Sequence, residues 1–210
     1  MTAEKRDFDK DAAGWDEKPA RVRLAQAVGN AIKEQVKPDA TMSMMDFGCG
    51  TGLLTSQLLP YVGSVTGIDS SSGMIEKFRT KFSGPDHQQV SCLTLDIEKG
   101  GQLTGKYDLI TSSMTLHHIR DIDNLFNQFY LITAPGGHLC IADLDSEDGR
   151  FHEDNTGVFH FGFDRSSLRQ VFVRAGFTDI RVVTATTMEK AVDNEEKKFS
   201  IFLMTGRKPL

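Results

Sequence analysis

The sequence predicts an α/β fold: a mostly parallel seven-stranded sheet with helices on both faces and an antiparallel hairpin at its C-terminal edge. Three observations predict it. Short apolar segments alternate with helix-competent segments through most of the 210 residues. A turn rich in glycine directly follows the first apolar segment, at residues 48–52. The last two strand-like segments have no helix between them, which favours antiparallel pairing.

The first half of the chain supplies three strands and the helices around them. From Ala20 to Val36 apolar residues recur at helical spacing until Pro38 ends the pattern, whereas residues 1–19 are polar and are expected to be irregular. Apolar side chains gather on one face of each of the two helices that follow. These helices are predicted over residues 53–59 and 72–82, and the strands over residues 42–47, 64–69 and 90–96.

The second half supplies the remaining four strands. Asp121 and Asp164 precede amphipathic segments and are predicted to cap two helices, which end before Pro135 and at Gly176. The charged residues 189–198 are expected to form a solvated connection. The strands are predicted over residues 107–112, 138–143, 178–187 and 199–206.

Length and composition indicate one domain over residues 1–210, with a hydrophobic content of 39% and a charged content of 25%. The net charge of −5 argues against a broad phosphate-binding surface, so neither DNA nor bulk RNA is the expected partner. The three cysteines are isolated, which predicts neither a disulfide framework nor a zinc site. They are Cys49, Cys92 and Cys140.

No apolar run approaches the roughly 20 residues that a membrane-spanning helix needs. The charged N-terminus does not have the composition of a signal peptide. We therefore expect a cytoplasmic protein, and no feature of the sequence indicates an oligomeric state.

The glycine turn gives the first indication of a ligand. Glycine tolerates positive φ and lets a ligand approach the main chain without a Cβ in the way. A dinucleotide-binding fingerprint would place its third glycine at position 53, which is Leu53, and this disfavours a nicotinamide-dependent oxidoreductase. Instead the motif is Gly48-x-Gly50-x-Gly52 with Asp46 two residues before it. This run resembles motif I of the class I S-adenosylmethionine-dependent methyltransferases, which have a Rossmann-like fold.

The resemblance implies a set of cofactor-binding residues. Asp69 matches the acid that holds the ribose hydroxyls, Asp96 matches the acid that accepts from the adenine amino group, and the segment after the fourth strand matches the lining of the methionine part. A carboxylate beside the turn also suits a zwitterion with a sulfonium better than a phosphate. The cofactor-binding residues are predicted to be Asp46, Gly48, Cys49, Gly50, Thr51, Gly52, Asp69, Ser70, Met74, Asp96, Ile97, Ser112 and Ser113.

The positions of polar residues along the chain agree with one ligand-binding crevice. Open α/β sheets bind ligands beyond the carboxyl ends of their strands. Each of the first five predicted strands is apolar in its body and polar at that end. A single Asp after a strand would be explained equally well by a helix cap. Polar residues at the ends of five strands around one crevice favour a binding site.

The segment after the fourth strand indicates the subtype. It contains His117-His118-Ile119, which resembles the type 11/12 small-molecule methyltransferases. It lacks the Asn-Pro-Pro-Tyr or Asp-Pro-Pro-Tyr sequence of enzymes that methylate amino groups of DNA. The resemblance therefore implies a small-molecule acceptor, with oxygen or carbon favoured over nitrogen as the acceptor atom.

His117 and His118 are the candidate catalytic bases, although packing or hydrogen bonding within the loop would also explain them. Residues 151–163 combine phenylalanines, histidines and acids without a regular period. The resemblance implies that residues 145–163 contribute to a substrate lid, although a loop that packs its phenylalanines into the core would also explain them, and that residues 1–37 form an N-terminal helical cap. The candidate substrate-binding residues are Trp15, Met114, His152 and His160. No metal is predicted, because the spacing of the acids and histidines in this segment matches no strong ligand pattern.

Two other functions stay open at this point. A methyltransferase acting on RNA or protein would show a basic face. A protein that binds S-adenosylmethionine without methylating would have a crevice closed to any acceptor.

Overall fold

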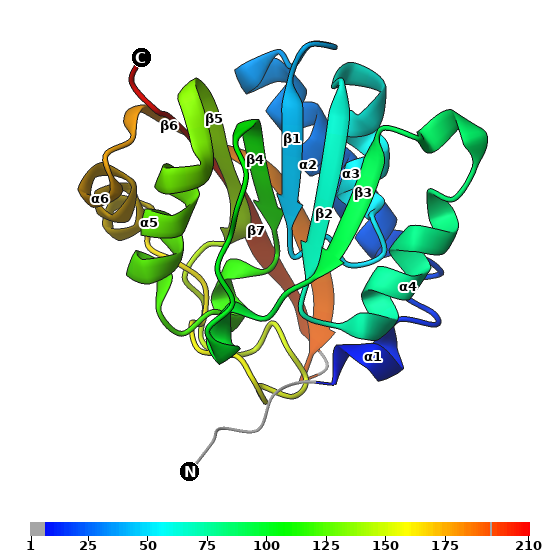
Figure 1. Cartoon of the computed structure of the whole chain (residues 1–210). Helices are drawn as coiled ribbons and strands as arrows, with labels where there is room; N and C mark the ends of the chain where they lie inside the picture. Colours follow the sequence, from blue (N-terminus) through cyan, green and yellow to red (C-terminus); the bar gives the residue numbers. More distant parts are fainter. Residues whose placement is uncertain (1–6, 194) are drawn as a thin grey trace.

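The computed structural model describes residues 7–193 and 195–210 and contains one seven-stranded sheet in the order β3-β2-β1-β4-β5-β7-β6 (Figure 1). Only β7 runs against its neighbours, since it pairs antiparallel with both β5 and β6. This confirms the predicted Rossmann-like sheet with a C-terminal edge hairpin. The strands are β1 (Ser43–Phe47), β2 (Ser64–Asp69), β3 (Val90–Thr94), β4 (Tyr107–Ser113), β5 (Thr133–Leu144), β6 (Thr178–Val192) and β7 (Glu195–Arg207).

Helices cover both faces of the sheet, and each face has its own hydrophobic core. One core packs α5 and α6 on the sheet through residues such as Phe129 and Phe172, and the other packs α2, α3 and α4 through residues such as Ile32 and Phe78. The α-helices are α1 (Phe8–Asp11), α2 (Pro19–Val36), α3 (Leu53–Leu58), α4 (Ser72–Lys81), α5 (Ile122–Ile132) and α6 (Arg165–Ala175). Short 3-10 turns are η1 (Leu59–Tyr61), η2 (Pro85–His87), η3 (Ile97–Lys99) and η4 (Leu116–His118).

The helix boundaries follow from capping. The Asp121 carboxylate accepts from the Asn124 amide at the start of α5, and Asp164 accepts from the Ser167 amide at the start of α6. Gly176 ends α6 in the left-handed conformation at φ 104°, as a glycine at this position permits. Both aspartates and this glycine have the capping roles that the sequence predicted.

The C-terminal hairpin is longer than predicted. Residues 189–192 belong to β6 and residues 195–198 to β7, so the charged stretch is paired strand and not a solvated connection. Glu189 lies opposite Lys198, and their charged groups are 3.0 Å apart. Along this segment, side chains that face solvent alternate with side chains that face the protein. Because many of them are charged, the sequence did not indicate a strand here.

Two smaller differences concern the ends of elements. The first residues of the chain are not wholly irregular, because α1 forms at Phe8–Asp11 with Asp7 as its cap. Strand β5 begins at Thr133, so Pro135 and the glycines after it lie within the strand, where the pairing with β4 shifts register. Proline fits there because the ladder is already irregular.

The predicted N-terminal cap, residues 1–37, comprises α1 and α2 in its described part, and residues 1–6 lie outside the described residues. The predicted lid, residues 145–163, connects β5 to α6. Both roles, and the description of residues 1–210 as one domain, stay predictions. Within residues 7–193 and 195–210, no helix has the length and apolar character needed to cross a membrane.

Candidate functional site

The glycine turn joins β1 to α3, and its three glycines serve different purposes. All have positive φ, at 69° for Gly48, 52° for Gly50 and 86° for Gly52. A Cβ on Gly48 would lie 2.2 Å from the Thr115 hydroxyl, and a Cβ on Gly52 would lie 2.5 Å from the Phe82 ring. A Cβ on Gly50 would meet nothing closer than 3.9 Å. Two glycines therefore permit close packing, and Gly50 leaves space above the turn.

Asp69, at the end of β2, holds the turn in place. One carboxylate oxygen accepts from the Gly50 amide at 2.8 Å, and the other accepts from the Ser71 amide at 2.8 Å. A carboxylate has about four acceptor positions, so these two amides leave capacity for further donors such as hydroxyls. Asp69 thus connects the glycine turn to the start of α4.

Asp46 lies beneath the turn and is 1% exposed. Its carboxylate accepts from the hydroxyls of Thr55 at 2.6 Å and Thr111 at 3.0 Å. Burial raises the pKa of Asp46 to about 6; the two hydroxyl hydrogen bonds oppose this shift, and the nearby Asp69 charge adds to it. The turn residue Cys49 is also buried, and burial raises the pKa of its thiol well above the usual value. A reactive thiolate at this position is therefore not favoured.

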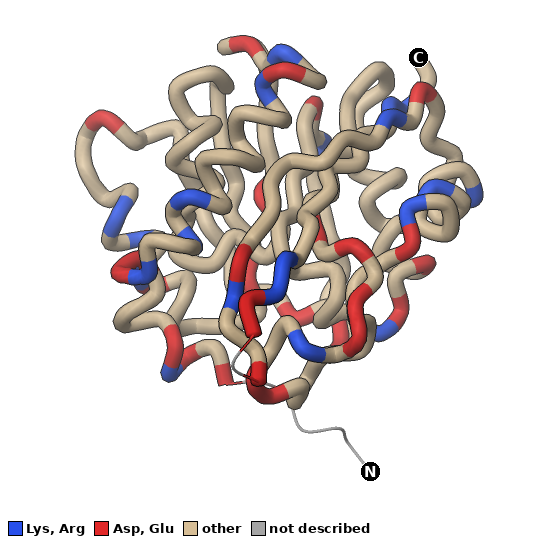
Figure 2. The backbone as a smooth tube through the Cα atoms, turned by 180° about the vertical axis from the view of Figure 1, so that it is seen from behind, with Lys and Arg blue, Asp and Glu red and all other residues tan. Residues whose placement is uncertain are grey.

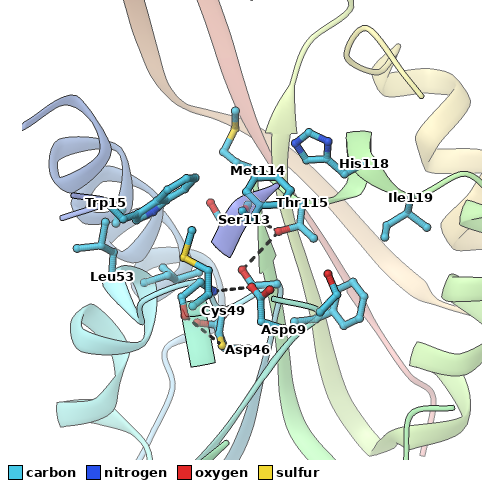
Figure 3. A pocket seen from close by; sticks show the side chains of 18 of the residues that line it. Trp15, Asp46, Cys49, Leu53, Asp69, Ser113, Met114, Thr115, His118 and Ile119 are labelled. Carbon is cyan, nitrogen blue, oxygen red and sulfur yellow. Dashed lines mark hydrogen bonds between the residues drawn. The ribbon is translucent and has the colours of Figure 1, made fainter. Parts of the chain in front are cut away.

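These residues line a cavity of about 170 Å³ at the carboxyl ends of the strands (Figure 3). Trp15 lies over the glycine turn, Asp69 lies at the base of the cavity, and His118 and Ile119 lie on the side of the cavity opposite Trp15. The cavity includes ten of the predicted cofactor-binding residues, namely Asp46, Gly48, Cys49, Gly50, Asp69, Ser70, Met74, Asp96, Ile97 and Ser113.

Three predicted cofactor-binding residues lie outside that lining: Thr51, Gly52 and Ser112. Gly52 packs on Phe82, as described, and the Ser112 hydroxyl is buried with no hydrogen-bond partner among the described residues. Asp96 lines the cavity and also caps η3 by accepting from the Glu98 amide at 3.1 Å. Binding and capping, the two alternatives weighed for these aspartates, are therefore compatible at this position.

The N-terminal segment contributes Phe8 and Trp15 to the lining of the cavity. Phe8 and Trp15 pack edge to face with ring centroids 6.1 Å apart, and the Arg21 guanidinium lies 3.4 Å from the centre of the Trp15 ring. Two carboxylates fasten the segment: Asp16 accepts from the Thr51 hydroxyl at 2.5 Å and Asp9 accepts from the Ser71 hydroxyl at 2.5 Å. Thr51 therefore supports the cover over the cavity.

A second cavity of about 560 Å³ adjoins the first. It reaches from α1 and α2 to the predicted lid and to β6, which contributes Met188 and Lys190. These two residues were not predicted from the sequence. The apolar residues Met188 and Val192 stand at every fourth position among charged ones, and this period could have indicated a strand with Lys190 on the same face. The two cavities share Phe8, Trp15, Arg21, Leu24, Met114 and His118.

Met114 lies at the junction of the two cavities and has an uncommon backbone conformation, with φ 54°. A residue with a Cβ adopts this left-handed region at a cost of about 1 kcal/mol. Its amide donates to the Ala142 carbonyl at 2.9 Å, which fixes the turn after β4 against β5. The strained turn places the following histidines at the second cavity.

His117 is buried and paired with Asp143, the residue near the end of β5. Its Nδ1 lies 2.7 Å from an Asp143 carboxylate oxygen, and its backbone amide donates to the other oxygen at 3.3 Å. Burial alone would raise the pKa of Asp143, but the contact and hydrogen bonds with His117 outweigh burial and hold this pKa below its usual value. Asp143 is therefore a carboxylate that fixes the His117 ring, and the sequence analysis did not assign it this role.

The other predicted histidines differ in position. His118 lines both cavities, and its Nδ1 lies 2.8 Å from the Gly157 carbonyl oxygen. His152 lines the second cavity, where its Nε2 lies 3.1 Å from Nε2 of His117. His160 lines neither cavity, because its Nε2 meets the Ile119 carbonyl oxygen at 2.9 Å. The structure thus brings His117, His118 and His152 together and leaves His160 apart.

Comparison with known proteins places this site in a family context. Residues 18–182 match the family described as the methyltransferase domain. An uncharacterized methyltransferase of Schizosaccharomyces pombe is 32% identical over 157 residues, which are 68% of this chain and 55% of that protein. Malonyl-(acyl-carrier protein) O-methyltransferase of Acetivibrio thermocellus is 31% identical over 149 residues, which are 65% of this chain and 50% of that protein. The chain spans about half the length of these two curated relatives.

Solved structures show the same fold at lower sequence identity. Phosphoethanolamine N-methyltransferase 2 of Haemonchus contortus, in complex with S-adenosyl-L-methionine, superposes with a TM-score of 0.69 at 18% identity. The match covers 87% of this chain and 52% of that one.

Proposed function

The chain belongs to the class I S-adenosylmethionine-dependent methyltransferases, and from this membership we propose that it methylates a small molecule held in the second cavity. One observation supports the proposal above the others. The cavity of the glycine turn and the cavity of the histidines adjoin, and they share Met114 and His118. A cofactor in the first cavity and an acceptor in the second would therefore meet at these two residues.

The first cavity fits the cofactor in its donor and acceptor groups. The Asp69 carboxylate offers acceptors for two hydroxyls on adjacent carbons, and Asp96 offers an acceptor for an adenine amino group. Gly50 keeps a Cβ out of the space beside Trp15 and Met74. When bound, S-adenosylmethionine supplies an electrophilic methyl group on a sulfonium. The residues of the chain orient it, and Phe8 and Trp15 exclude water from above.

The second cavity suits an acceptor with an apolar body and an acidic proton. Its lining combines apolar groups, such as Phe151 and Met188, with the three histidines and with charged side chains of both signs. We propose that His117 and His118 activate the acceptor by stabilising its deprotonated form, with Asp143 holding the His117 ring. An imidazole near an oxygen or an activated carbon can do this near neutral pH. The O-methyltransferase named among the relatives supports oxygen as the acceptor atom.

Charge and cavity shape favour this proposal over its alternatives. On the side of the molecule seen in Figure 2, Lys and Arg positions are interspersed with Asp and Glu, and the described residues there form no continuous basic band for RNA. The second cavity argues against a protein that only binds the cofactor, because such a protein needs no space beside the methyl group. The compartment in which the protein works stays a prediction.

The test combines binding with turnover. We expect calorimetry to show S-adenosylmethionine binding that weakens about 100-fold in Asp69→Ala, because this change removes both amide contacts and the charged acceptor. The matched control is Asp86→Ala, at an exposed aspartate outside both cavities. Unchanged affinity in Asp69→Ala would refute the assignment of this carboxylate.

Turnover is measured as S-adenosylhomocysteine release from a panel of hydroxylated, carboxylated and activated-methylene metabolites. We expect one chemical class of acceptor to raise the release above the background without acceptor. Cofactor binding without stimulation by any small molecule, together with stimulation by RNA or protein, would overturn the proposed acceptor class.

A further inference from the structure

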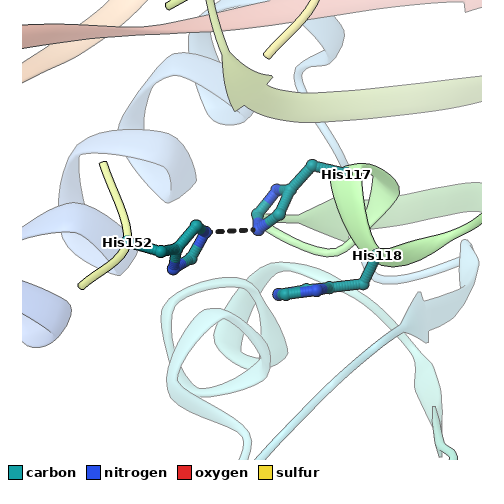
Figure 4. A group of neighbouring side chains, drawn as sticks. All are labelled: His117, His118 and His152. Carbon is teal, nitrogen blue, oxygen red and sulfur yellow. Dashed lines mark hydrogen bonds between the residues drawn. The ribbon is translucent and has the colours of Figure 1, made fainter. Parts of the chain in front are cut away.

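We propose that His117, His118 and His152 form a binding site for a divalent zinc-type metal ion at the boundary of the two cavities. One ring nitrogen from each histidine lies within 4.8 Å of the other two. Figure 4 shows the three rings turned toward a shared space, with His152 approaching from the segment after β5 and the other two from η4. The sequence separation between His118 and His152 is why spacing along the chain did not reveal this group.

The hydrogen bonds of two rings leave their Nε2 atoms suited to bind a metal. The Nδ1 atoms of His117 and His118 lie 2.7 Å from the Asp143 carboxylate and 2.8 Å from the Gly157 carbonyl. Both partners only accept, so each Nδ1 carries the proton and each Nε2 carries the lone pair of the neutral ring. Histidine ligands of metals are held in this way, with the second nitrogen donating to a carboxylate or a carbonyl.

The contact between His117 and His152 has the spacing of two ligands on one ion. Their Nε2 atoms are 3.1 Å apart, and two nitrogens about 2.0–2.1 Å from a tetrahedral zinc ion lie about 3.3 Å from each other. A proton shared between these two rings would account for their distance alone. It would not account for the third ring, whose centroid lies 4.2 Å from that of His117 and 5.6 Å from that of His152.

Closing the site requires a small movement. The largest separation of 4.8 Å must shrink by about 1.5 Å to reach the spacing of a tetrahedral ion. His117 is 1% exposed and fixed by Asp143, whereas His118 and His152 are only partly buried, so we expect the adjustment at His118 and His152. The buried Asp143 carboxylate also supplies negative charge behind the ligand that moves least.

Three protein ligands leave one position of a tetrahedral ion open, and all three histidines line the second cavity. Only this part of the inference rests on the proposed function: an oxygen of the acceptor would take the open position. The histidines would then act as ligands rather than as proton acceptors, and the proton of the acceptor would leave to solvent. Imidazole ligands with an open position favour zinc over magnesium or calcium, which prefer oxygen ligands.

The test uses full-length protein without a polyhistidine tag, stripped with a chelator and titrated with Zn²⁺ alone by calorimetry. We expect one ion per chain, and an affinity that falls on the order of 100-fold in His118→Ala and in His152→Ala. The same samples titrated with Co²⁺ should show the intense visible absorption of a four-coordinate ion. The control is His87→Ala, a histidine outside both cavities, which should leave both readouts unchanged.

Equal Zn²⁺ affinity in all four proteins, or a Co²⁺ spectrum of a six-coordinate surface ion, would overturn the metal site. Circular dichroism is used to check that each variant is folded. S-adenosylmethionine binding is measured in the same samples, because cofactor binding without metal binding would refute this inference and leave the proposed function standing. Metal binding without cofactor binding would support this inference and refute the proposed function.

Discussion

The Thr51 hydroxyl donates to the Asp16 carboxylate at 2.5 Å, and this bond ties the N-terminal segment to the glycine turn. Asp16 also forms an ion pair with Lys81 at 2.6 Å, at the end of α4. The segment that carries Trp15 is thus fastened to the same two elements that frame the first cavity. We therefore expect access to the cofactor pocket to depend on these contacts.

We expect Thr51→Val to weaken cofactor binding about fivefold to tenfold, because one hydrogen bond to a charged group that is partly exposed contributes about 1 kcal/mol. The loss should appear as faster dissociation, measured by stopped-flow fluorescence of Trp15, since the cover opens more often. Thr178→Val, at an exposed position of β6, is the control. A dissociation rate equal in both variants would show that the contact does not hold the cover.

Substitutions at Gly50 and Gly52 should differ in their effects on cofactor binding and on protein stability. Gly50→Ala is expected to cost about 1 kcal/mol in stability, from its φ of 52°, and to lower cofactor affinity because the Cβ faces the cavity. Gly52→Ala should cost more than about 2 kcal/mol, since its Cβ would lie 2.5 Å from Phe82. Urea unfolding and calorimetry measure the two effects. Equal destabilisation by both changes would contradict the different roles given to these glycines.

Asp46 should make stability fall as pH rises through the mildly acidic range. The unfolded chain releases this proton near pH 3.8, whereas the folded protein keeps it until about pH 6. Between these values the folded state binds more protons, so the free energy of unfolding decreases with pH, by up to about 3 kcal/mol. Asp46→Asn has no such titration. Its stability relative to the wild-type protein should therefore increase from pH 4 to pH 7 in urea unfolding, and a constant difference would refute the shift.

Replacing His117 or His118 by Ala should lower turnover by about 100-fold or more, because both histidines line the second cavity. Cofactor affinity should stay unchanged in His117→Ala, since this ring does not line the first cavity. His160→Ala is the matched control, since this ring lines neither cavity. The measurement is S-adenosylhomocysteine release with the acceptor found by screening. Full activity in both variants would remove these histidines from the reaction.

The fold and the first cavity could be predicted from the sequence because both follow from local patterns. Strand periodicity and the spacing of three glycines are visible along the chain, and Asp69 is the last residue of its strand. The second cavity could not be predicted in the same way. The contact of His152 with His117 and the placement of Lys190 depend on loop and hairpin geometry, which joins segments far apart in sequence. The role of Asp143 was missed because its partner His117 comes from η4, 26 residues earlier in the chain.

The wall of the second cavity is assembled from the N-terminal segment, the residues after β5 and the far part of β6. None of these segments contains the glycine turn or Asp69. The residues after β5 and the far part of β6 could therefore diverge or be exchanged between relatives while the cofactor pocket stays intact, whereas the N-terminal segment also lines that pocket through Phe8 and Trp15. A chimera that carries the hairpin and lid of another family member should bind the same cofactor and methylate a different acceptor. Acceptor specificity could therefore change without any change in the cofactor pocket.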